Sequence, residues 1–184
     1  MVKAHFFTIA DYEEEEAWLR KQHNRGLRLV GFHLPCFYVF EECTPEDVIY
    51  RIDYQNSFEG SDYRQMFKDF GWEYILNSTG FIYFRKPADE IKSENDGEIF
   101  SDNFSKLNML TRIIKTRMFP ILISFFLCAL PGYVRMFDIR ERAGDPFFTV
   151  FSVIFSAAFG FLCVLIFYCG LKLRRLRKKY ERDK

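Results

Sequence analysis

Residues 147–171 read FFTVFSVIFSAAFGFLCVLIFYCGL, a stretch of 25 residues without a charged side chain. A second stretch, residues 118–134, reads MFPILISFFLCALPGYV and contains 17 uncharged residues. A helix needs roughly 20 apolar residues to cross the ~30 Å hydrocarbon core of a bilayer. Arg135 directly follows the shorter stretch, and its long side chain can reach the membrane surface and extend the span. We therefore predict transmembrane helices at 118–137 and 147–171, joined by a short external loop at 138–146.

The charges that flank the two predicted spans indicate their orientation. Four basic residues lie just before the first span, and a basic cytoplasmic tail, residues 172–184, follows the second. The tail residues expected to contact lipid headgroups are Lys172, Arg174, Arg175, Arg177, Lys178 and Lys179. Basic residues near span ends are retained in the cytoplasm, and each contributes about 1 kcal/mol of attraction to an anionic lipid surface. We predict that both termini are cytoplasmic in a bacterial-type inner membrane, and we expect no signal peptide.

Small residues recur at four-residue spacing in both predicted spans. They are Ser124, Cys128 and Gly132 in the first span and Ser152, Ser156 and Gly160 in the second. Such faces let membrane helices approach closely, so we expect them to pack the spans into a hairpin. Homo-oligomerisation through the same faces is the alternative. Neither span contains Asp, Glu, Lys, Arg or His, which argues against a proton relay or an ion-coupled transporter.

Residues 1–88 have the composition of a separate soluble domain, with 10 Lys or Arg against 14 Asp or Glu. Their hydrophobic periodicity alternates between 2 and about 3.6 residues and predicts the order β-α-β-β-β-α-β-β. The expected fold class is therefore α+β, a ferredoxin-like-type sandwich in which both helices cover one face of a single sheet. The first helix carries the run Glu13 to Glu16, which we expect on a solvated face near the positive end of the helix dipole.

The sheet face away from the helices is expected to display aromatic side chains. The candidates are Tyr50, Tyr54, Trp72, Phe81 and Tyr83. Exposed aromatic residues can line a ligand groove, seat a protein partner, pack against a membrane surface or form a dimer interface. A place in the core is the alternative for these residues, and for Trp72 it is the favoured one.

Residues 89–117 connect this domain to the first span. Their first part is polar and acidic and indicates a linker. The second part carries an apolar stripe of Leu107, Leu110, Ile113 and Ile114 between basic residues. This pattern predicts an amphipathic helix, which either lies in the inner membrane interface or simply extends the first span.

The sequence contains no recognisable catalytic constellation. The three histidines lack metal-site spacing, and the five cysteines include no CxxC pair. We therefore expect no metal, no cofactor and no enzymatic activity. The net charge of −4 over residues 1–88 would repel phosphate, which disfavours nucleic acid as a partner.

Three local features resemble the bacterial family DUF2812. They are the helix bearing Trp18-Leu19, the Gly26-x-x-Leu29 turn into a strand, and the GWEY sequence at Gly71–Tyr74. The resemblance covers about residues 1–120. Members of this family are typically followed by transmembrane helices, and their genes often neighbour PadR-like transcription factors. The resemblance implies a regulatory or membrane-stress role and supplies no catalytic residue.

These observations lead to two hypotheses about function. The first is a membrane-tethered cytoplasmic binding and regulatory module that senses a signal, such as envelope stress, and docks an unknown protein partner. The alternative is an accessory or pore-lining subunit of a small membrane transport complex.

Overall fold

The protein is seen in a computed structural model that describes residues 1–55, 60–100, 103–143 and 146–182. The chain forms two compact units. The head domain comprises Met1–Arg112 together with the chain end from Tyr180, and the helical hairpin comprises Ile113–Lys179. This division confirms a sheet domain combined with a pair of long apolar helices.

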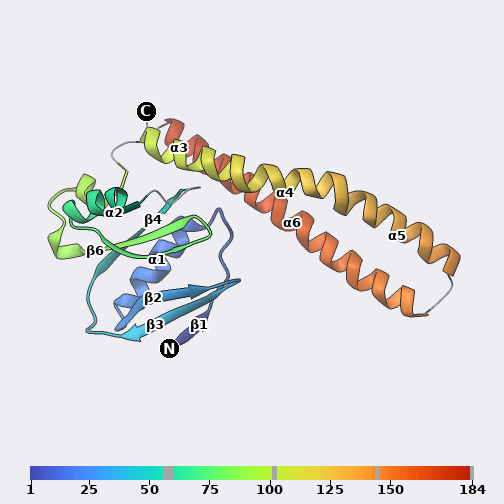
Figure 1. The fold of residues 1–184 in the computed structure, drawn as a ribbon, viewed down its shortest axis with the longest axis horizontal. Coiled ribbons are helices and arrows are strands. Elements are labelled where there is room, and N and C mark those ends of the chain that lie inside the picture. The colour runs from blue at the N-terminus through green and yellow to red at the C-terminus, as the bar shows by residue number, and fades with distance from the viewer. Residues whose placement is uncertain (56–59, 101–102, 144–145, 183–184) are drawn as a thin grey trace. The chain divides into compact units, whose positions relative to one another are not determined.

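The head domain has the predicted element order. Its elements are β1 (Val2–Ala4), α1 (Tyr12–His23), β2 (Leu27–His33), β3 (Phe37–Glu42), β4 (Val48–Tyr54), α2 (Gly60–Asp69), β5 (Glu73–Ser78) and β6 (Phe81–Pro87) (Figure 1). The mixed α+β class is confirmed. The strands, however, form two antiparallel three-stranded sheets, in the orders β1-β3-β2 and β4-β6-β5, instead of the single expected sheet.

The two sheets meet at strands β2 and β5, which lie next to each other without sharing a ladder. Both strands carry an irregularity in register against their own partners, between Leu29 and Gly31 in β2 and between Tyr74 and Leu76 in β5. A bulge of this kind leaves a residue unpaired and bends the strand locally.

Helix α1 packs against strands of both sheets, β2 and β4 (Figure 1). Its buried Leu19 joins a core that includes Leu29, Phe40 and Ile52. The chain turns after α1 at Gly26, which has φ of +80°, and a Cβ atom there would lie 2.9 Å from the Cys43 carbonyl oxygen. Only glycine fits this turn without displacing the backbone.

Residues 88–100 differ from the expected linker. Two short 3₁₀ turns, η1 (Ala88–Glu90) and η2 (Glu94–Gly97), are followed by Ile99, which packs against an apolar cluster around Trp72. Asp96 forms an ion pair with Lys86 at 2.8 Å. This segment is therefore an integral part of the head domain.

The hairpin consists of two long helical runs. The first run passes through α3 (Asn103–Ile113), η3 (Ile114–Met118), α4 (Phe119–Ser124), η4 (Phe125–Ala129) and α5 (Leu130–Ala143), and the second is α6 (Pro146–Arg182) (Figure 1). The segments Asn103–Met136 and Thr149–Glu181 are long and apolar enough to cross a membrane. The predicted span 118–137 overlaps the first segment nearly throughout, and 147–171 overlaps the second.

The segments η3 and η4 are π-helical turns, and each ends two residues before a proline, Pro120 or Pro131. Proline lacks an N–H group and collides with the carbonyl four residues earlier in a regular α-helix. A wider π turn at that point relieves the conflict. The first run therefore continues past Pro131.

Aromatic stacking joins the two helices of the hairpin. The Tyr133 and Phe159 rings are stacked with centroids 4.3 Å apart, and Phe125 stacks on Phe159 at 5.2 Å. Two of the predicted small residues, Gly132 and Gly160, have open surroundings. A Cβ atom added at Gly132 or Gly160 would meet nothing within 4 Å.

The other members of those faces are placed as follows. Ser124 is exposed, Ser156 is half-buried, and Ser152 is buried and donates a hydrogen bond to the Thr149 carbonyl at 2.8 Å. The side chain of Cys128 lies outside the described residues. Close packing through these small residues stays a prediction, and the described contacts across the hairpin are the ring contacts of Phe125 and Tyr133 with Phe159.

Candidate functional site

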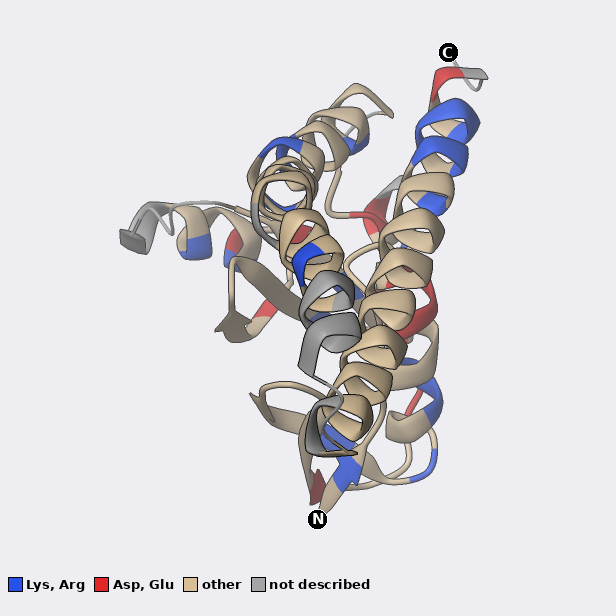
Figure 2. Ribbon diagram, turned by 90° about the vertical axis from the view of Figure 1, so that its right-hand side faces the viewer, with Lys and Arg blue, Asp and Glu red and all other residues tan. Residues whose placement is uncertain are grey.

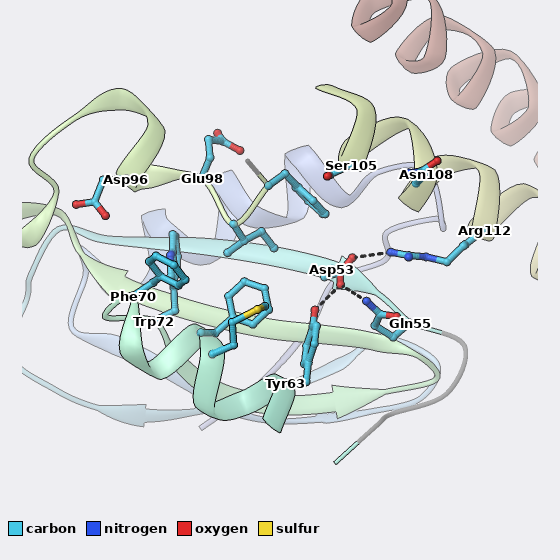
Figure 3. Close-up of a pocket in the computed structure, with 14 residues that line it drawn as sticks. Asp53, Gln55, Tyr63, Phe70, Trp72, Asp96, Glu98, Ser105, Asn108 and Arg112 are labelled. Carbon is cyan, nitrogen blue, oxygen red and sulfur yellow. Dashed lines mark hydrogen bonds and ion pairs between the residues drawn. The ribbon is translucent and has the colours of Figure 1, made fainter. Parts of the chain in front are cut away.

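The head domain contains an open cleft of about 620 Å³ (Figure 3). Its walls come from α2 and the turn that follows it, from the end of β4, and from residues 96–100 and 105–112. The lining residues are Asp53, Gln55, Tyr63, Met66, Phe67, Phe70, Trp72, Asp96, Glu98, Ile99, Phe100, Ser105, Asn108 and Arg112. A volume of this size is typical of ligand-binding cavities.

One wall of the cleft is apolar because α2 presents its hydrophobic face to it. The residues Phe67 and Trp72 are buried in the cluster beneath α2. Met66 on α2 and Phe70, which directly follows α2, remain exposed, and Phe70 has 65% of its surface accessible. An exposed apolar surface next to a cavity is typical of a binding site.

The opposite end of the cleft is organised by Asp53, which is only 3% exposed. Its carboxylate accepts hydrogen bonds from the Tyr63 hydroxyl, from Gln55 Nε2 at 2.9 Å and from Arg112 Nη2 at 3.4 Å (Figure 3). Burial, followed by the adjacent carboxylate, raises the pKa of Tyr63. The hydroxyl therefore stays protonated and keeps donating to Asp53 at neutral pH.

Two further acidic residues, Asp96 and Glu98, line the cleft, and their basic partners are not among its lining residues. Asp96 is paired with Lys86, which lowers the pKa of Asp96. Glu98 bridges Arg51 and Lys106, each at 2.9 Å. The cleft lining thus presents three carboxylates and one guanidinium, that of Arg112.

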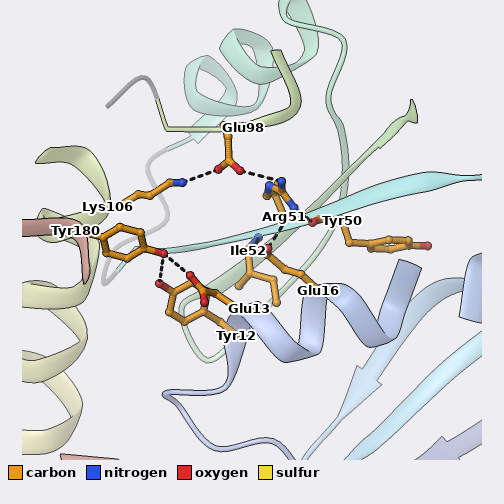
Figure 4. A network of polar contacts seen from close by, with 9 residues as sticks. All are labelled: Tyr12, Glu13, Glu16, Tyr50, Arg51, Ile52, Glu98, Lys106 and Tyr180. Carbon is orange, nitrogen blue, oxygen red and sulfur yellow. Dashed lines mark hydrogen bonds and ion pairs between the residues drawn. The ribbon is translucent and has the colours of Figure 1, made fainter. Parts of the chain in front are cut away.

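Glu98 also belongs to a polar network centred on α1 (Figure 4). Arg51, which pairs with Glu98, also pairs with Glu16, and its Nη1 atom lies 3.3 Å from a Glu16 carboxylate oxygen. The Glu16 carboxylate also accepts a hydrogen bond from the Ile52 N–H at 2.8 Å. Burial raises the pKa of Glu16 from 4.5 to about 8, although Arg51 and the Ile52 N–H both favour the carboxylate. The network therefore contains a carboxyl group that titrates near neutral pH.

The same network includes the end of α6 (Figure 4). Tyr180 is buried, its hydroxyl lies 3.2 Å from that of Tyr12, and it donates a hydrogen bond to Glu13. Lys106 Nζ lies 5.5 Å from the centroid of the Tyr180 ring. A single tyrosine in a basic tail gave no sign of this role in the sequence.

The glutamate run of α1 is not uniformly solvated, contrary to expectation. Glu14 is exposed, but Glu15 is 7% exposed and accepts hydrogen bonds from the hydroxyls of Tyr38 at 2.8 Å and Tyr83 at 2.7 Å. Burial raises the pKa of Glu15, and these two hydrogen bonds oppose the shift. Successive helix residues are rotated by about 100°, so part of a four-residue run must face the sheets.

The predicted aromatic face is found inside the protein. Tyr50, Tyr54, Trp72 and Tyr83 are buried, and the half-buried Phe81 packs against Tyr54 with ring centroids 4.9 Å apart. Helix α1 covers β4, so these rings do not form an open docking face. Trp72 alone among them lines the cleft.

The basic tail residues lie near the C-terminal end of α6 (Figure 2). Arg174, Arg175, Arg177, Lys178 and Lys179 are exposed, and Lys172 is half-buried. The ammonium group of Lys172 lies 5.9 Å from the centroid of the Tyr168 ring. Among the described residues there is no group of three or more His, Cys, Asp or Glu side chains placed to hold a metal ion.

The chain thus combines a mixed α+β head domain, which contains an open cleft, with an apolar helical hairpin. The family DUF2812, described as a protein of unknown function, matches residues 11–123. The chain therefore belongs to DUF2812, as its resemblance indicated. The matched region contains every residue that lines the cleft and reaches into the first apolar helix. No curated protein and no solved structure matches the chain.

Proposed function

We propose that this protein is a membrane-tethered binding and regulatory module whose head domain binds a ligand in the cleft below α2. The observation that carries the proposal is the cleft itself, a 620 Å³ cavity with an exposed aromatic wall and a buried carboxylate at one end. Helix α3 contributes Ser105, Asn108 and Arg112 to it and continues into an apolar run that ends at Met136. Ligand binding would therefore change the conformation of α3 at the start of a membrane helix, and a protein partner would respond to that change.

The membrane setting of this proposal follows from charge. The hairpin lies in a bacterial inner membrane, with the basic segments before and after it in the cytoplasm. The exposed basic side chains near the end of α6 contact anionic lipid headgroups. Tags placed at either end of the chain should resist protease added to intact spheroplasts. Cleavage of either tag under those conditions would contradict this orientation.

Photocrosslinking tests the binding role of the cleft. A benzoylphenylalanine residue placed at Phe70 in the full chain, in its native membrane, should give a discrete crosslinked product that mass spectrometry can identify. Phe6 is the matched control because it is similarly exposed, at 58%, and does not line the cleft. Equal yields from both positions, or none from Phe70, would contradict the proposal.

A second candidate function is that of an accessory or pore-lining subunit of a transport complex. It is favoured by the open surroundings of Gly132 and Gly160, where nothing lies within 4 Å of an added Cβ. Such surfaces permit close packing with another membrane helix. Mass measurement in mild detergent distinguishes the two, since this alternative requires a stable oligomer that Gly132→Leu and Gly160→Leu would disrupt.

A further inference from the structure

The cleft leaves an apolar surface uncovered at one end. Phe70 and Met66 are exposed there, whereas the cluster beneath α2, which includes Phe67 and Trp72, is buried. Covering apolar surface contributes about 25 cal/mol per Å². An occupant with an apolar body would therefore be stabilised at this end, against the rings of Phe70 and Trp72.

The polar groups that face the cleft define the charge of that occupant. Asp96 and Glu98 each keep 30% of their side chain exposed, and their partners Lys86, Arg51 and Lys106 do not line the cavity. A carboxylate has about four acceptor sites, so these ion pairs leave acceptor capacity on both side chains. Residues 1–112 carry 13 Lys or Arg against 20 Asp or Glu, which makes the surrounding field negative.

The aromatic end already holds one cation of the protein. Lys86 Nζ lies 5.9 Å from the Trp72 ring centroid, donates to the Phe70 carbonyl at 3.0 Å and pairs with Asp96. Aromatic faces beside carboxylates attract cations, and most strongly those with little hydration to lose. Lys86 does not line the cleft and its ring contact is with Trp72, so the exposed Phe70 ring stays open to an external ligand.

From these observations we infer that the cleft binds an organic cation with a bulky apolar body, with its apolar groups against Phe70 and Trp72 and its charge toward Asp96 and Glu98. The inference rests on the proposed function, because it names the ligand class of the same cleft. The volume of about 620 Å³ suits a drug-sized molecule.

Two probes of matched shape test the charge requirement. Tetraphenylphosphonium and tetraphenylborate have the same four-phenyl body and opposite charge. The full-length chain carrying Trp18→Phe keeps Trp72 as its single tryptophan, so its fluorescence reports on the cleft in neutral-lipid nanodiscs. We expect a saturable change with the phosphonium ion at an affinity at least about tenfold higher than with the borate.

Matched variants distinguish binding of the probe in the cleft from partitioning of the probe into lipid, because the partitioning is the same for every variant. Phe70→Ala and Glu98→Gln should each weaken phosphonium binding about five- to tenfold. Phe6→Ala and Glu46→Gln, which alter exposed residues outside the cleft, should leave it unchanged. Phe70 is exposed, so its replacement leaves the fold intact and keeps the test valid if Glu98→Gln disturbs the network.

The outcomes are distinct. Equal affinity for both probes, sensitive to Phe70→Ala, would overturn the cation preference and leave the cleft as an apolar binding site. Phosphonium binding that is insensitive to both cleft variants, or no saturable signal from either probe, would overturn the inference. In these cases crosslinking from position 70 still decides separately whether the cleft is a binding site at all.

Discussion

The head domain buries polar side chains, whereas the hairpin exposes apolar ones. In the head, Glu15 and Asp53 are buried and each accepts hydrogen bonds from neighbouring side chains. In the hairpin, apolar residues such as Phe161 and Val164 are exposed along α6. Buried polar groups are stable only when they are hydrogen-bonded, whereas exposed apolar surface of this extent is stable only in an apolar environment. The difference indicates that the two units are built for different solvents.

The sharpest way to break this comparison is to charge the exposed surface of the hairpin. The double substitution Phe161→Arg and Val164→Arg places two guanidinium groups near the middle of the predicted span. Each costs about 2.5–3.5 kcal/mol if the helix lies in lipid, so we expect the variant to be lost from the carbonate-resistant membrane fraction.

Phe6→Arg is the control for this double variant. Phe6 is exposed in the head, where a surface substitution changes stability by about 0.5 kcal/mol or less. The control should fractionate like the unaltered protein. A double variant that also kept its membrane fraction and its thermal stability would show that α6 does not lie in lipid.

A smaller effect is expected from removing a buried acceptor in the head. Glu15→Ala leaves the buried hydroxyls of Tyr38 and Tyr83 without their carboxylate, at a cost of about 3 kcal/mol. Chemical unfolding of the full chain, followed by tryptophan fluorescence, measures this loss. The exposed neighbour Glu14→Ala should change the unfolding free energy by less than about 0.5 kcal/mol.

Removing the donors as well sharpens this test. The triple variant Glu15→Ala, Tyr38→Phe and Tyr83→Phe should be more stable than Glu15→Ala alone, because no buried polar group is then left unpaired. A triple variant that is less stable than Glu15→Ala would show that Glu15 contributes through packing instead of through its hydrogen bonds.

The composition and hydrophobic periodicity of the sequence were enough to predict the helical hairpin and the order of helices and strands in the head domain. A run of 25 uncharged residues has no stable place in a domain of this size, and alternating periods distinguish strands from helices. They did not reveal the division into two sheets. Periodicity identifies a strand but does not identify the strand with which it pairs.

The candidate site could not be assembled from the sequence because its walls come from distant segments. Asp53, Phe70, Glu98 and Arg112 span some sixty residues and meet only in the folded chain. The polar composition of residues 89–100 indicated a linker, whereas the Lys86–Asp96 ion pair attaches this segment to the domain. Specific pairing of charges, unlike their number, is a property of the tertiary structure.

The last prediction uses pH to distinguish a buried carboxyl group from a solvated one on the same helix. The pKa of Glu16 is about 8 in the folded protein against an ordinary value of 4.5, so the folded state retains a proton that the unfolded chain releases. The contribution of Glu16 to stability is therefore full below about pH 4.5 and is lost as pH rises toward 8, by up to about 1.4 kcal/mol per pH unit.

Glu16→Gln removes this titration, so its unfolding free energy should fall less steeply between pH 5 and 8 than that of the unaltered chain. Glu14→Gln, at an exposed position two residues away, should keep the original slope. His23, whose pKa is lowered mainly by burial, titrates in all three proteins and cancels in the comparison. Parallel pH profiles for the unaltered chain and Glu16→Gln would mean that Arg51 holds Glu16 ionised throughout this range, and the network would then be a fixed ion pair and not a group that responds to pH.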